Sequence, residues 1–134
     1  MSGERQGVVA VIERDGRLLV IRRSAQVVAP GAFCFPGGGI EPGESEEAAL
    51  VRELREELCV PVQPVRLLWR STTPWGVRLA WWRAGLAPSA VLEPVAAEVE
   101  SVHWLTPAEI RSLDGLLESN HHFFAALERG EIEW

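Results

Sequence analysis

The chain contains no lysine and no tyrosine, and its 134 residues include only two cysteines, two aspartates and a single asparagine. All 13 of its basic residues are therefore arginines. Codon bias in a GC-rich genome would produce this imbalance by itself, but arginine is also the planar, fork-shaped partner of phosphate and carboxylate groups. Codon bias is therefore the favoured explanation for the imbalance, and a role of some arginines in binding phosphate is the alternative.

Other shortages exclude whole classes of protein. Cys34 and Cys59 are too few for a disulfide framework, and their apolar neighbours in the sequence predict small buried thiols in a reducing compartment. No apolar run approaches the roughly 18 residues of a membrane span, and Glu13 and Arg14 interrupt the early apolar stretch that a signal peptide would need. A net charge of −6 argues against binding bulk nucleic acid through a positive surface. We therefore expect a cytoplasmic protein without membrane or bulk nucleic-acid partners.

What the chain does contain is sufficient for one hydrophobic core. Its length and its 47% hydrophobic residues predict a single domain over residues 1–134. Strands are expected over residues 8–12, 18–22, 33–35, 65–70, 77–83 and 99–105. The first two flank Asp15-Gly16, a strong hairpin signal, and the third is stopped by Pro36 and three glycines. Helices are expected over residues 45–58, after Thr106 and after Asn120, so the elements together predict an α/β sandwich.

The predicted helix over residues 45–58 carries three carboxylates on one face. At 100° per residue, Glu53, Glu56 and Glu57 share an arc of about 100° that borders the apolar stripe of the helix. Carboxylates this close repel one another unless a cation lies among them or some of them are protonated. Their oxygens suit a hard divalent ion such as Mg²⁺ or Mn²⁺. The alternative is a solvated helix face that is held by pairs such as Arg52 with Glu56.

The wider spacing decides between these interpretations. Gly38, five residues, Glu44, seven residues and then Arg52-Glu53-Leu54-Arg55-Glu56-Glu57 reproduce the Nudix box, G-x5-E-x7-R-E-U-x-E-E-x-G-U. Arg55 stands at an unspecified position, and chance agreement at the seven specified ones is on the order of one in a million. The chain therefore resembles the Nudix hydrolase family and its MutT-like members. One position departs from the box, because Cys59 stands where the family usually has a glycine that relaxes the helix end.

The resemblance implies a fold, an activity and a cofactor. The fold would be a single-domain α/β/α sandwich with a mixed β-sheet. The activity would be metal-dependent cleavage of a diphosphate linkage in a nucleoside triphosphate or another nucleoside diphosphate derivative, with nucleotide-pool sanitation as one such role. The cofactor would be Mg²⁺ or Mn²⁺. By the same resemblance the metal ligands would be Glu53, Glu56, Glu57 and a backbone carbonyl of Gly37 or Gly38.

Further residues would orient these ligands or move a proton. By the family's pattern, Arg52 and Glu44 would orient the carboxylates, and Glu53 is one candidate for the general base. Some relatives take an additional ligand or base from outside the box. Glu98 is the best-placed match for it, with Glu100 as the second choice and an ordinary solvated strand edge as the alternative for both.

Four kinds of residue are candidates for substrate binding. Arg22 and Arg23 match a position where relatives use arginine on the substrate phosphates, although strand-end arginines are usually plain surface residues. Asn120 matches the place where MutT-like relatives carry a base-reading asparagine, and a helix N-cap is its alternative role. Phe35 and Trp75 are candidates for stacking on a base, against simple packing.

Two other classes of function use the same fold. A catalytically silent module would bind nucleotides or a partner protein, but silent versions typically lose box glutamates and this chain retains them all. An isomerase or a glycosylase is the other alternative, although a glycosylase would need further domains for which 134 residues leave no room. The expected partner is a small nucleotide. A homodimer stays open, since dimers are common in the family.

Overall fold

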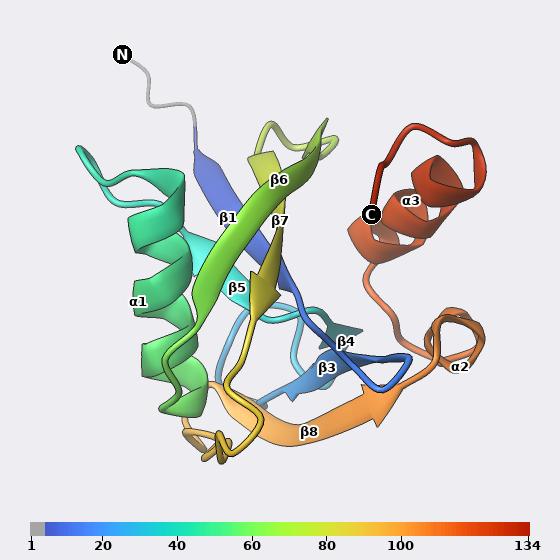
Figure 1. Ribbon diagram of the computed structural model, residues 1–134. Coiled ribbons are helices and arrows are strands. Elements are labelled where there is room, and N and C mark those ends of the chain that lie inside the picture. Colours follow the sequence, from blue (N-terminus) through green and yellow to red (C-terminus); the bar gives the residue numbers. More distant parts are fainter. Residues whose placement is uncertain (1–4) are drawn as a thin grey trace.

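Eight strands and three helices make up residues 5–134, which are the part of the chain that the computed structural model describes (Figure 1). The strands are β1 (Gln6–Val11), β2 (Glu13–Arg14), β3 (Arg17–Arg23), β4 (Phe33–Cys34), β5 (Gly37–Gly39), β6 (Gln63–Thr72), β7 (Arg78–Gly85) and β8 (Val99–Leu105). The helices are α1 (Glu46–Leu58), α2 (Pro107–Arg111) and α3 (Glu118–Glu128). Every strand and helix expected from the sequence is present, with bounds shifted by a few residues.

The strands form two sheets. The first has the order β5-β1-β7-β6, in which β1 and β7 run parallel and the other neighbours run antiparallel, so the sheet is mixed. In the second sheet β3 pairs with β2, β4 and β8, always antiparallel. The first sheet stands between α1 and α3, and the second lies across its lower end in Figure 1. This arrangement confirms the expected α/β/α sandwich with a mixed sheet.

Strand β1 supplies both faces of the core, because successive side chains of a strand point to opposite sides. Val8 and Ala10 belong to the apolar cluster beneath α1, together with Leu50 of that helix. Val9 and Val11 belong to the second cluster, beneath α3. Because both faces of β1 are covered, the strand is apolar from Gly7 to Val11 instead of alternating with polar residues.

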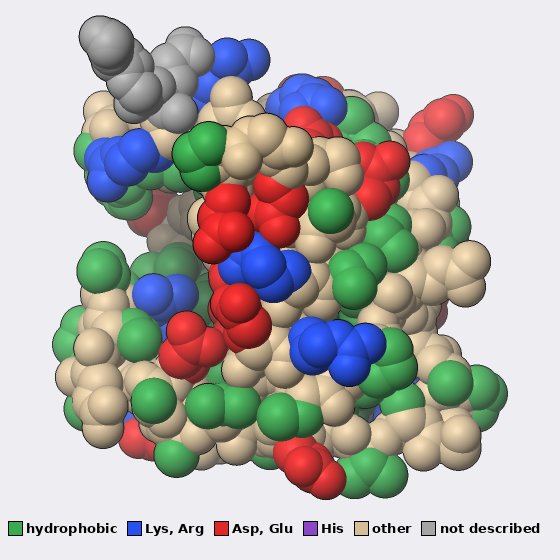
Figure 2. All heavy atoms as spheres, turned by 90° about the vertical axis from the view of Figure 1, so that its left-hand side faces the viewer, with side chains coloured by type: hydrophobic (Ala, Val, Ile, Leu, Met, Phe, Trp, Pro, Cys, Tyr) green, Lys and Arg blue, Asp and Glu red, His purple; other side chains and the backbone are tan. Residues whose placement is uncertain are grey.

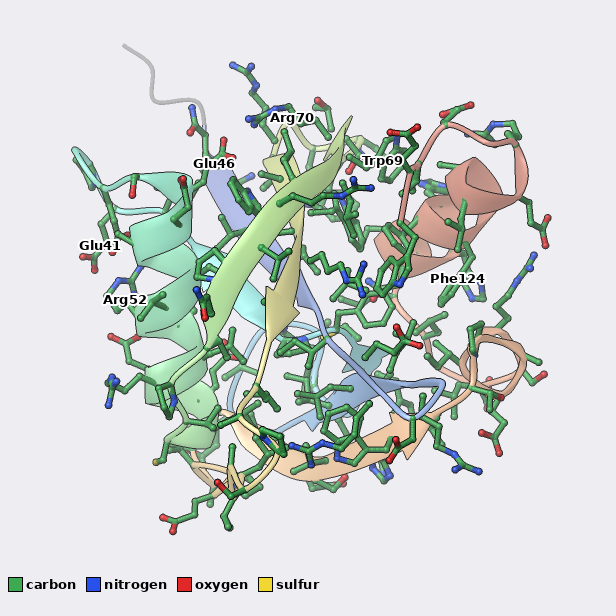
Figure 3. The ribbon with its side chains drawn as sticks, viewed as in Figure 1. Glu41, Glu46, Arg52, Trp69, Arg70 and Phe124 are labelled. Carbon is green, nitrogen blue, oxygen red and sulfur yellow. The ribbon has the colours of Figure 1, made fainter. Side chains whose placement is uncertain are left out.

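Aromatic rings hold α3 against the sheet. Phe123 stacks on Trp81 of β7 with ring centroids 5.0 Å apart and meets the edge of Phe35 at 5.7 Å. Trp69 of β6 and Phe124 complete the cluster, both on the α3 side of the sheet (Figure 3). Such pairs contribute about 0.5–1.5 kcal/mol each beyond the area they bury. The middle of α3 is therefore fixed relative to the strands.

Two expectations about the strands were wrong in part. Asp15 and Gly16 form a turn with φ angles of 53° and 78°, but the hairpin joins only β2 to the beginning of β3. The preceding strand β1 leaves for the other sheet, where β5 and β7 are its partners. The three glycines do not end the extended chain after Phe35 either, since Gly37–Gly39 form β5 opposite β1. A strand without side chains is suited to this place because α1 packs closely against it.

Helix α1 begins at a cap and ends in a strained residue. Ser45 is the N-cap, and its Oγ accepts a hydrogen bond of 3.0 Å from the backbone N–H of Ala48. At the other end Cys59 takes the left-handed conformation with a φ of 53°, and its N–H donates to the Arg55 carbonyl. The side chain of Cys59 is exposed while Cys34 is buried, and both thiols are free. The prediction of two buried thiols is therefore right for Cys34 and wrong for Cys59, because the chain turns away from the core at the helix end.

An ion pair fixes the first turn of α1 to the sheet. The carboxylate of Glu46 accepts a hydrogen bond of 2.6 Å from Arg70 of β6 and one of 3.0 Å from the indole N–H of Trp82 (Figure 3). These contacts hold α1 against β6 and β7, so the acidic face of the helix keeps one orientation relative to β5.

The two C-terminal helices begin differently. Thr106 and Glu109 form the expected capping box at α2. Helix α3 begins at Glu118, earlier than expected, so Asn120 lies inside its first turn and Leu117 occupies the cap position. The N-cap alternative for Asn120 is therefore wrong. No helix among residues 5–134 is long and apolar enough to cross a membrane.

Candidate active site

Helix α1 approaches β5 so closely that the strand needs glycine at the contact. A Cβ atom on Gly38 would lie 1.6 Å from Oε2 of Glu53. One on Gly37 would lie 2.1 Å from the backbone oxygen of Val8, whereas one on Gly39 would have no atom within 4 Å. Gly38 therefore leaves the space that the Glu53 carboxylate occupies.

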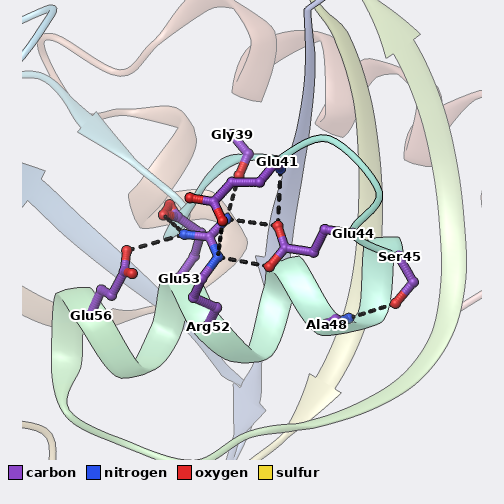
Figure 4. A network of polar contacts seen from close by, with 8 residues as sticks. All are labelled: Gly39, Glu41, Glu44, Ser45, Ala48, Arg52, Glu53 and Glu56. Atoms are coloured by element: carbon purple, nitrogen blue, oxygen red, sulfur yellow. Dashed lines mark hydrogen bonds and ion pairs between the residues drawn. The ribbon is translucent and has the colours of Figure 1, made fainter.

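Arg52 is the centre of a polar network on α1 (Figure 4). Its Nε and Nη2 donate to the two carboxylate oxygens of Glu44 at 2.7 and 2.9 Å. Its Nη1 donates to Glu53 and Glu56, at 3.1 Å each, and Nη2 also donates to the Gly39 carbonyl at 2.8 Å. Hydrogen bonds from Arg52 lower the pKa of Glu44 to about 2. In Figure 2 acidic side chains gather around a basic one on this face of the molecule.

Glu53 and Glu57 lie deeper than the other carboxylates. Burial is the main cause that raises the pKa of Glu53 to about 7 and the pKa of Glu57 to about 8. Glu57 accepts a hydrogen bond from the backbone of Gly37, but its Oε1 is buried without a hydrogen-bond partner among the described residues. The third box carboxylate, Glu56, is exposed, with 51% of its side-chain surface accessible. The motif thus combines one exposed carboxylate with two that are largely buried.

The two acidic residues proposed outside the motif separate in space. The charge of Glu98 contributes to the raised pKa values of both Glu53 and Glu57, so Glu98 lies within electrostatic range of these two carboxylates. Glu100 instead forms an exposed ion pair of 3.1 Å with Arg22. The structure therefore brings Glu98 to the site and leaves Glu100 on the surface.

A divalent ion would require some of these carboxylates to turn. No three side chains of the His, Cys, Asp or Glu type within residues 5–134 converge closely enough to hold a metal. Arg52 is one reason, because it holds Oε1 of both Glu53 and Glu56. The buried, unpartnered oxygen of Glu57 nevertheless fits a cation, and carboxylate oxygens are the ligands that hard divalent ions prefer. The residues present therefore fit such an ion.

A cavity of about 820 Å³ opens beside the carboxylates, where the surface in Figure 2 is hollowed. Its volume and its mixture of apolar and polar walls are typical of a small-molecule site. Strands β1, β5 and β7 and the start of α3 all contribute to it. Its walls include Arg23, Phe35, Gly37, Gly38, Glu44, Leu79, Leu117, Ser119 and Asn120.

The structure separates the two candidate phosphate arginines. Arg23 lines the cavity, and its Nε donates to the Val28 carbonyl at 2.6 Å. Arg22 donates to the Gly31 carbonyl and pairs with Glu100 on the outside. Of these two arginines, Arg23 is therefore the one that lines the cavity where a substrate would bind.

The candidate base contacts divide in the same way. Asn120 lines the cavity, and its Oδ1 accepts a hydrogen bond of 2.9 Å from the backbone N–H of Phe35. Phe35 also lines the cavity, but it is only 3% exposed and its ring is packed among Trp81 and Phe123, so it forms a floor instead of a free stacking partner. Trp75 is 66% exposed and contributes nothing to the cavity wall.

Several wall residues have no motif that would identify them from the sequence. Leu117 precedes α3 and Ser119 lies in its first turn, and both reach the cavity beside β5 only through the fold. Leu79 has one sequence signal, the alternation that places it on the same face of β7 as the buried Trp81. Ser24, which follows β3, also has no sequence signal, because the partner of its hydroxyl, the Ala97 carbonyl, lies 73 residues away.

Comparisons with known proteins agree with this geometry. A family model described as the NUDIX domain matches residues 2–127. The chain is 57% identical over 51 residues to a CTP pyrophosphohydrolase of Escherichia coli K12, covering 38% of each protein. It is 35% identical over 102 residues to a MutT-like protein of Streptomyces ambofaciens, covering 75% of this chain and 62% of the relative. The chain thus spans less than two thirds of the length of these relatives.

The fold is shared with solved structures as well. The crystal structure of a MutT protein from Methanosarcina mazei Go1 superposes with a TM-score of 0.77 at 21% identity. The superposition covers 95% of this chain and 94% of that one, so the likeness in fold extends over nearly the whole of both.

Proposed function

This chain belongs to the NUDIX family, and from that premise we propose that it is a metal-dependent hydrolase of phosphoric anhydride bonds. Its substrate would be a nucleoside triphosphate or another nucleoside diphosphate derivative. Residues 1–134 would form a single domain of this kind, acting on small nucleotides in the cytoplasm.

The observation that carries the proposal is the buried carboxylate of Glu57. An ionised carboxylate without water or a cation is unfavourable, which is why burial raises its pKa to about 8. Its Oε1 lacks a partner among residues 5–134, and an unsatisfied buried oxygen costs about 1–3 kcal/mol or more when charged. A divalent ion would remove both penalties at once. Glu53, with a pKa raised to about 7, adds a second desolvated ligand beside it.

Strand register supports Gly37 over Gly38 as the source of a carbonyl ligand. The N–H of Ala10 donates to the Pro36 carbonyl, which makes that pair a hydrogen-bonded one in the β1–β5 ladder. Because such pairs alternate, Gly38 directs its polar groups to β1, and Gly37 directs its own away from β1, at the free edge of the sheet. The backbone hydrogen bond from Gly37 to Glu57 agrees with this direction. The proposed ligands are therefore Glu53, Glu56, Glu57 and the carbonyl of Gly37.

The remaining residues would orient the metal ligands or accept a proton. A bound Mg²⁺ or Mn²⁺ would offset the charge of the diphosphate and acidify a water molecule. Arg52, itself held by both oxygens of Glu44, orients Glu53 and Glu56. Glu98 would accept the proton of the attacking water, with Glu53 as the other candidate base.

The cavity favours a nucleotide as substrate. Arg23 would contact its phosphates, and Asn120 with Phe35 would contact its base. The names of the relatives, a CTP pyrophosphohydrolase and a MutT-like protein, support a nucleoside triphosphate over other derivatives. A silent nucleotide-binding module is the weaker alternative, since every acidic box position is retained.

A substrate screen tests the proposal. Nucleoside triphosphates, ADP-ribose, dinucleotide polyphosphates and sugar nucleotides are incubated with Mg²⁺ or Mn²⁺, and products are identified by mass. We expect turnover by the wild type, a loss of about 100-fold or more in Glu57→Gln, and little change in Glu47→Gln, an exposed control on the same helix. Unchanged turnover in Glu57→Gln contradicts the metal site. Binding without turnover of any nucleotide supports the silent module.

A further inference from the structure

Ser24 connects the end of β3 to the turn that carries Glu98. The residue follows Arg23 and is only 4% exposed. Its hydroxyl donates a hydrogen bond of 2.8 Å to the Ala97 carbonyl and accepts one of 3.2 Å from the backbone N–H of Gln26. Its own backbone N–H donates to the Glu98 carbonyl at 3.1 Å. Ser24 therefore binds two successive carbonyls of a turn that lies more than seventy residues along the chain.

The same segment is attached on its other side to α1. The N–H of Val95 donates to the Glu57 carbonyl, and the N–H of Glu93 donates to the Leu58 carbonyl, both at 2.9 Å. The last carbonyls of a helix have no partner within the helix, so these bonds also cap α1. Residues 93–98 thus run between the helix that carries the box carboxylates and the strand that ends in Arg23.

We propose that Ser24 is a positioning residue that holds Glu98 against the box carboxylates. The inference rests on the proposed function, in which Glu98 accepts a proton or completes the ligand set. Glu98 lies in a turn outside any helix or strand, so its side chain is only as fixed as that turn. The backbone bond from Ser24 to Glu98 fixes one carbonyl, and the hydroxyl bond to Ala97 fixes the peptide before it.

Removal of the hydroxyl should therefore affect the chemical step more than binding. Ser24→Ala leaves the Ala97 carbonyl and the Gln26 N–H without their partner, and the turn is held by backbone bonds alone. We expect kcat to fall about tenfold, because small displacements of a reacting group are costly, while KM stays within about twofold. Ser24→Thr keeps the hydroxyl and should stay within about threefold of the wild type. Ser101→Ala is the matched control, since that hydroxyl forms its hydrogen bond with the nearby His103 ring.

A double-mutant cycle separates positioning from general stability. If Ser24 acts through Glu98, Ser24→Ala should lower kcat in the wild type but leave it within about twofold in a Glu98→Gln background. Hydrogen exchange of the amides of residues 95–99 should also become faster in Ser24→Ala, a readout that needs no activity. Ser24→Cys, with its weaker donor, replaces the alanine variant if that variant does not fold.

Three results would overturn the inference while the proposed function stands. They are an undiminished kcat in Ser24→Ala, an equal loss in both backgrounds of the cycle, and unchanged exchange at residues 95–99. A wild type that hydrolyses nucleotides but is indifferent to Glu98→Gln removes the role of Glu98 and the inference with it. A wild type that hydrolyses none of the nucleotides contradicts the proposed function itself.

Discussion

Three consecutive glycines of β5 should respond to alanine in three different ways. In Gly38→Ala the new methyl group would stand 1.6 Å from Oε2 and 2.3 Å from Cδ of Glu53. Carbon and oxygen atoms that are not bonded stay about 3 Å or more apart, so the carboxylate must withdraw by roughly 1.5 Å. Its hydrogen bond from Arg52, now 3.1 Å, would stretch or break. The fold loses little, because the obstacle is the end of a flexible side chain.

The magnitudes follow from which atom is displaced. A misplacement of about 1 Å at a reacting group costs on the order of 100-fold in rate, so we expect that loss in kcat/KM for Gly38→Ala with a change of less than about 1 kcal/mol in unfolding free energy. Gly37→Ala instead meets the backbone oxygen of Val8 at 2.1 Å, which cannot move without shifting β1. We expect it to cost about 3 kcal/mol or more in stability. Gly39→Ala meets nothing within 4 Å and should be close to neutral.

The assay pairs urea unfolding with nucleotide turnover on all three variants. Gly38→Ala should keep the urea midpoint of the wild type but lose its nucleotide turnover. Gly37→Ala should unfold at a lower urea concentration than the wild type. Full activity in Gly38→Ala would mean that the position of Glu53 is unimportant and would refute the reasoning. So would a loss of stability in Gly38→Ala equal to that of Gly37→Ala.

The remaining predictions concern other parts of the fold. Cys59→Gly relieves a left-handed φ and should raise the unfolding free energy in urea by roughly 0.5–1 kcal/mol; a decrease would contradict the strain. A thiol reagent at about pH 8 should label Cys59 in the native protein but reach Cys34, whose pKa burial raises to about 11, only after unfolding, and labelling of both at once would be the contrary result. Arg23→Lys keeps the charge and loses the fork, so the KM for a triphosphate should rise about tenfold at constant kcat, whereas an unchanged KM leaves Arg23 without a phosphate role. Phe123→Ala should cost about 3–5 kcal/mol by calorimetry, and a cost below 1 kcal/mol would deny the aromatic cluster its part in holding α3.

Local signals explain what could be predicted of the fold. Ser45 and the capping box at Thr106 act within a few residues of themselves, so the starts of α1 and α2 could be predicted from the sequence. The partners of β1 could not be predicted in this way. Its pairing with β5 and β7 depends on burial of both faces of the strand, and not on the Asp15-Gly16 turn that follows it. A turn dipeptide fixes the chain reversal but not how far the ladder extends beyond it.

The same distinction applies to the candidate site. The box spacing predicted which residues share a face of α1, and Arg52 does bind Glu44, Glu53 and Glu56. It could not predict that Glu57 would be buried with an unpartnered oxygen while Glu56 stays exposed, because burial depends on the strands beneath the helix. Nor could it give a physical reason for preferring Arg23 to Arg22 as the phosphate contact, since the bulge between these residues in the pairing with β8 exists only in the folded sheet.

Cys59 shows why a departure from the box need not disturb the site. A glycine at a helix end lets the chain turn left-handed, and Cys59 makes the same turn with a φ of 53°. The carbonyls of Glu57 and Leu58 are satisfied by N–H groups of residues 93 and 95, so the helix end is stabilised from outside the motif. A strain of about 1–2 kcal/mol for a side chain in this conformation is within reach of two such hydrogen bonds, each contributing about 0.5–1.5 kcal/mol. The hydrogen bonds that offset the strain at Cys59 therefore come from the same segment that carries Glu98. We expect a change at Cys59 to affect the position of Glu98, and a change at Glu98 to affect the helix end.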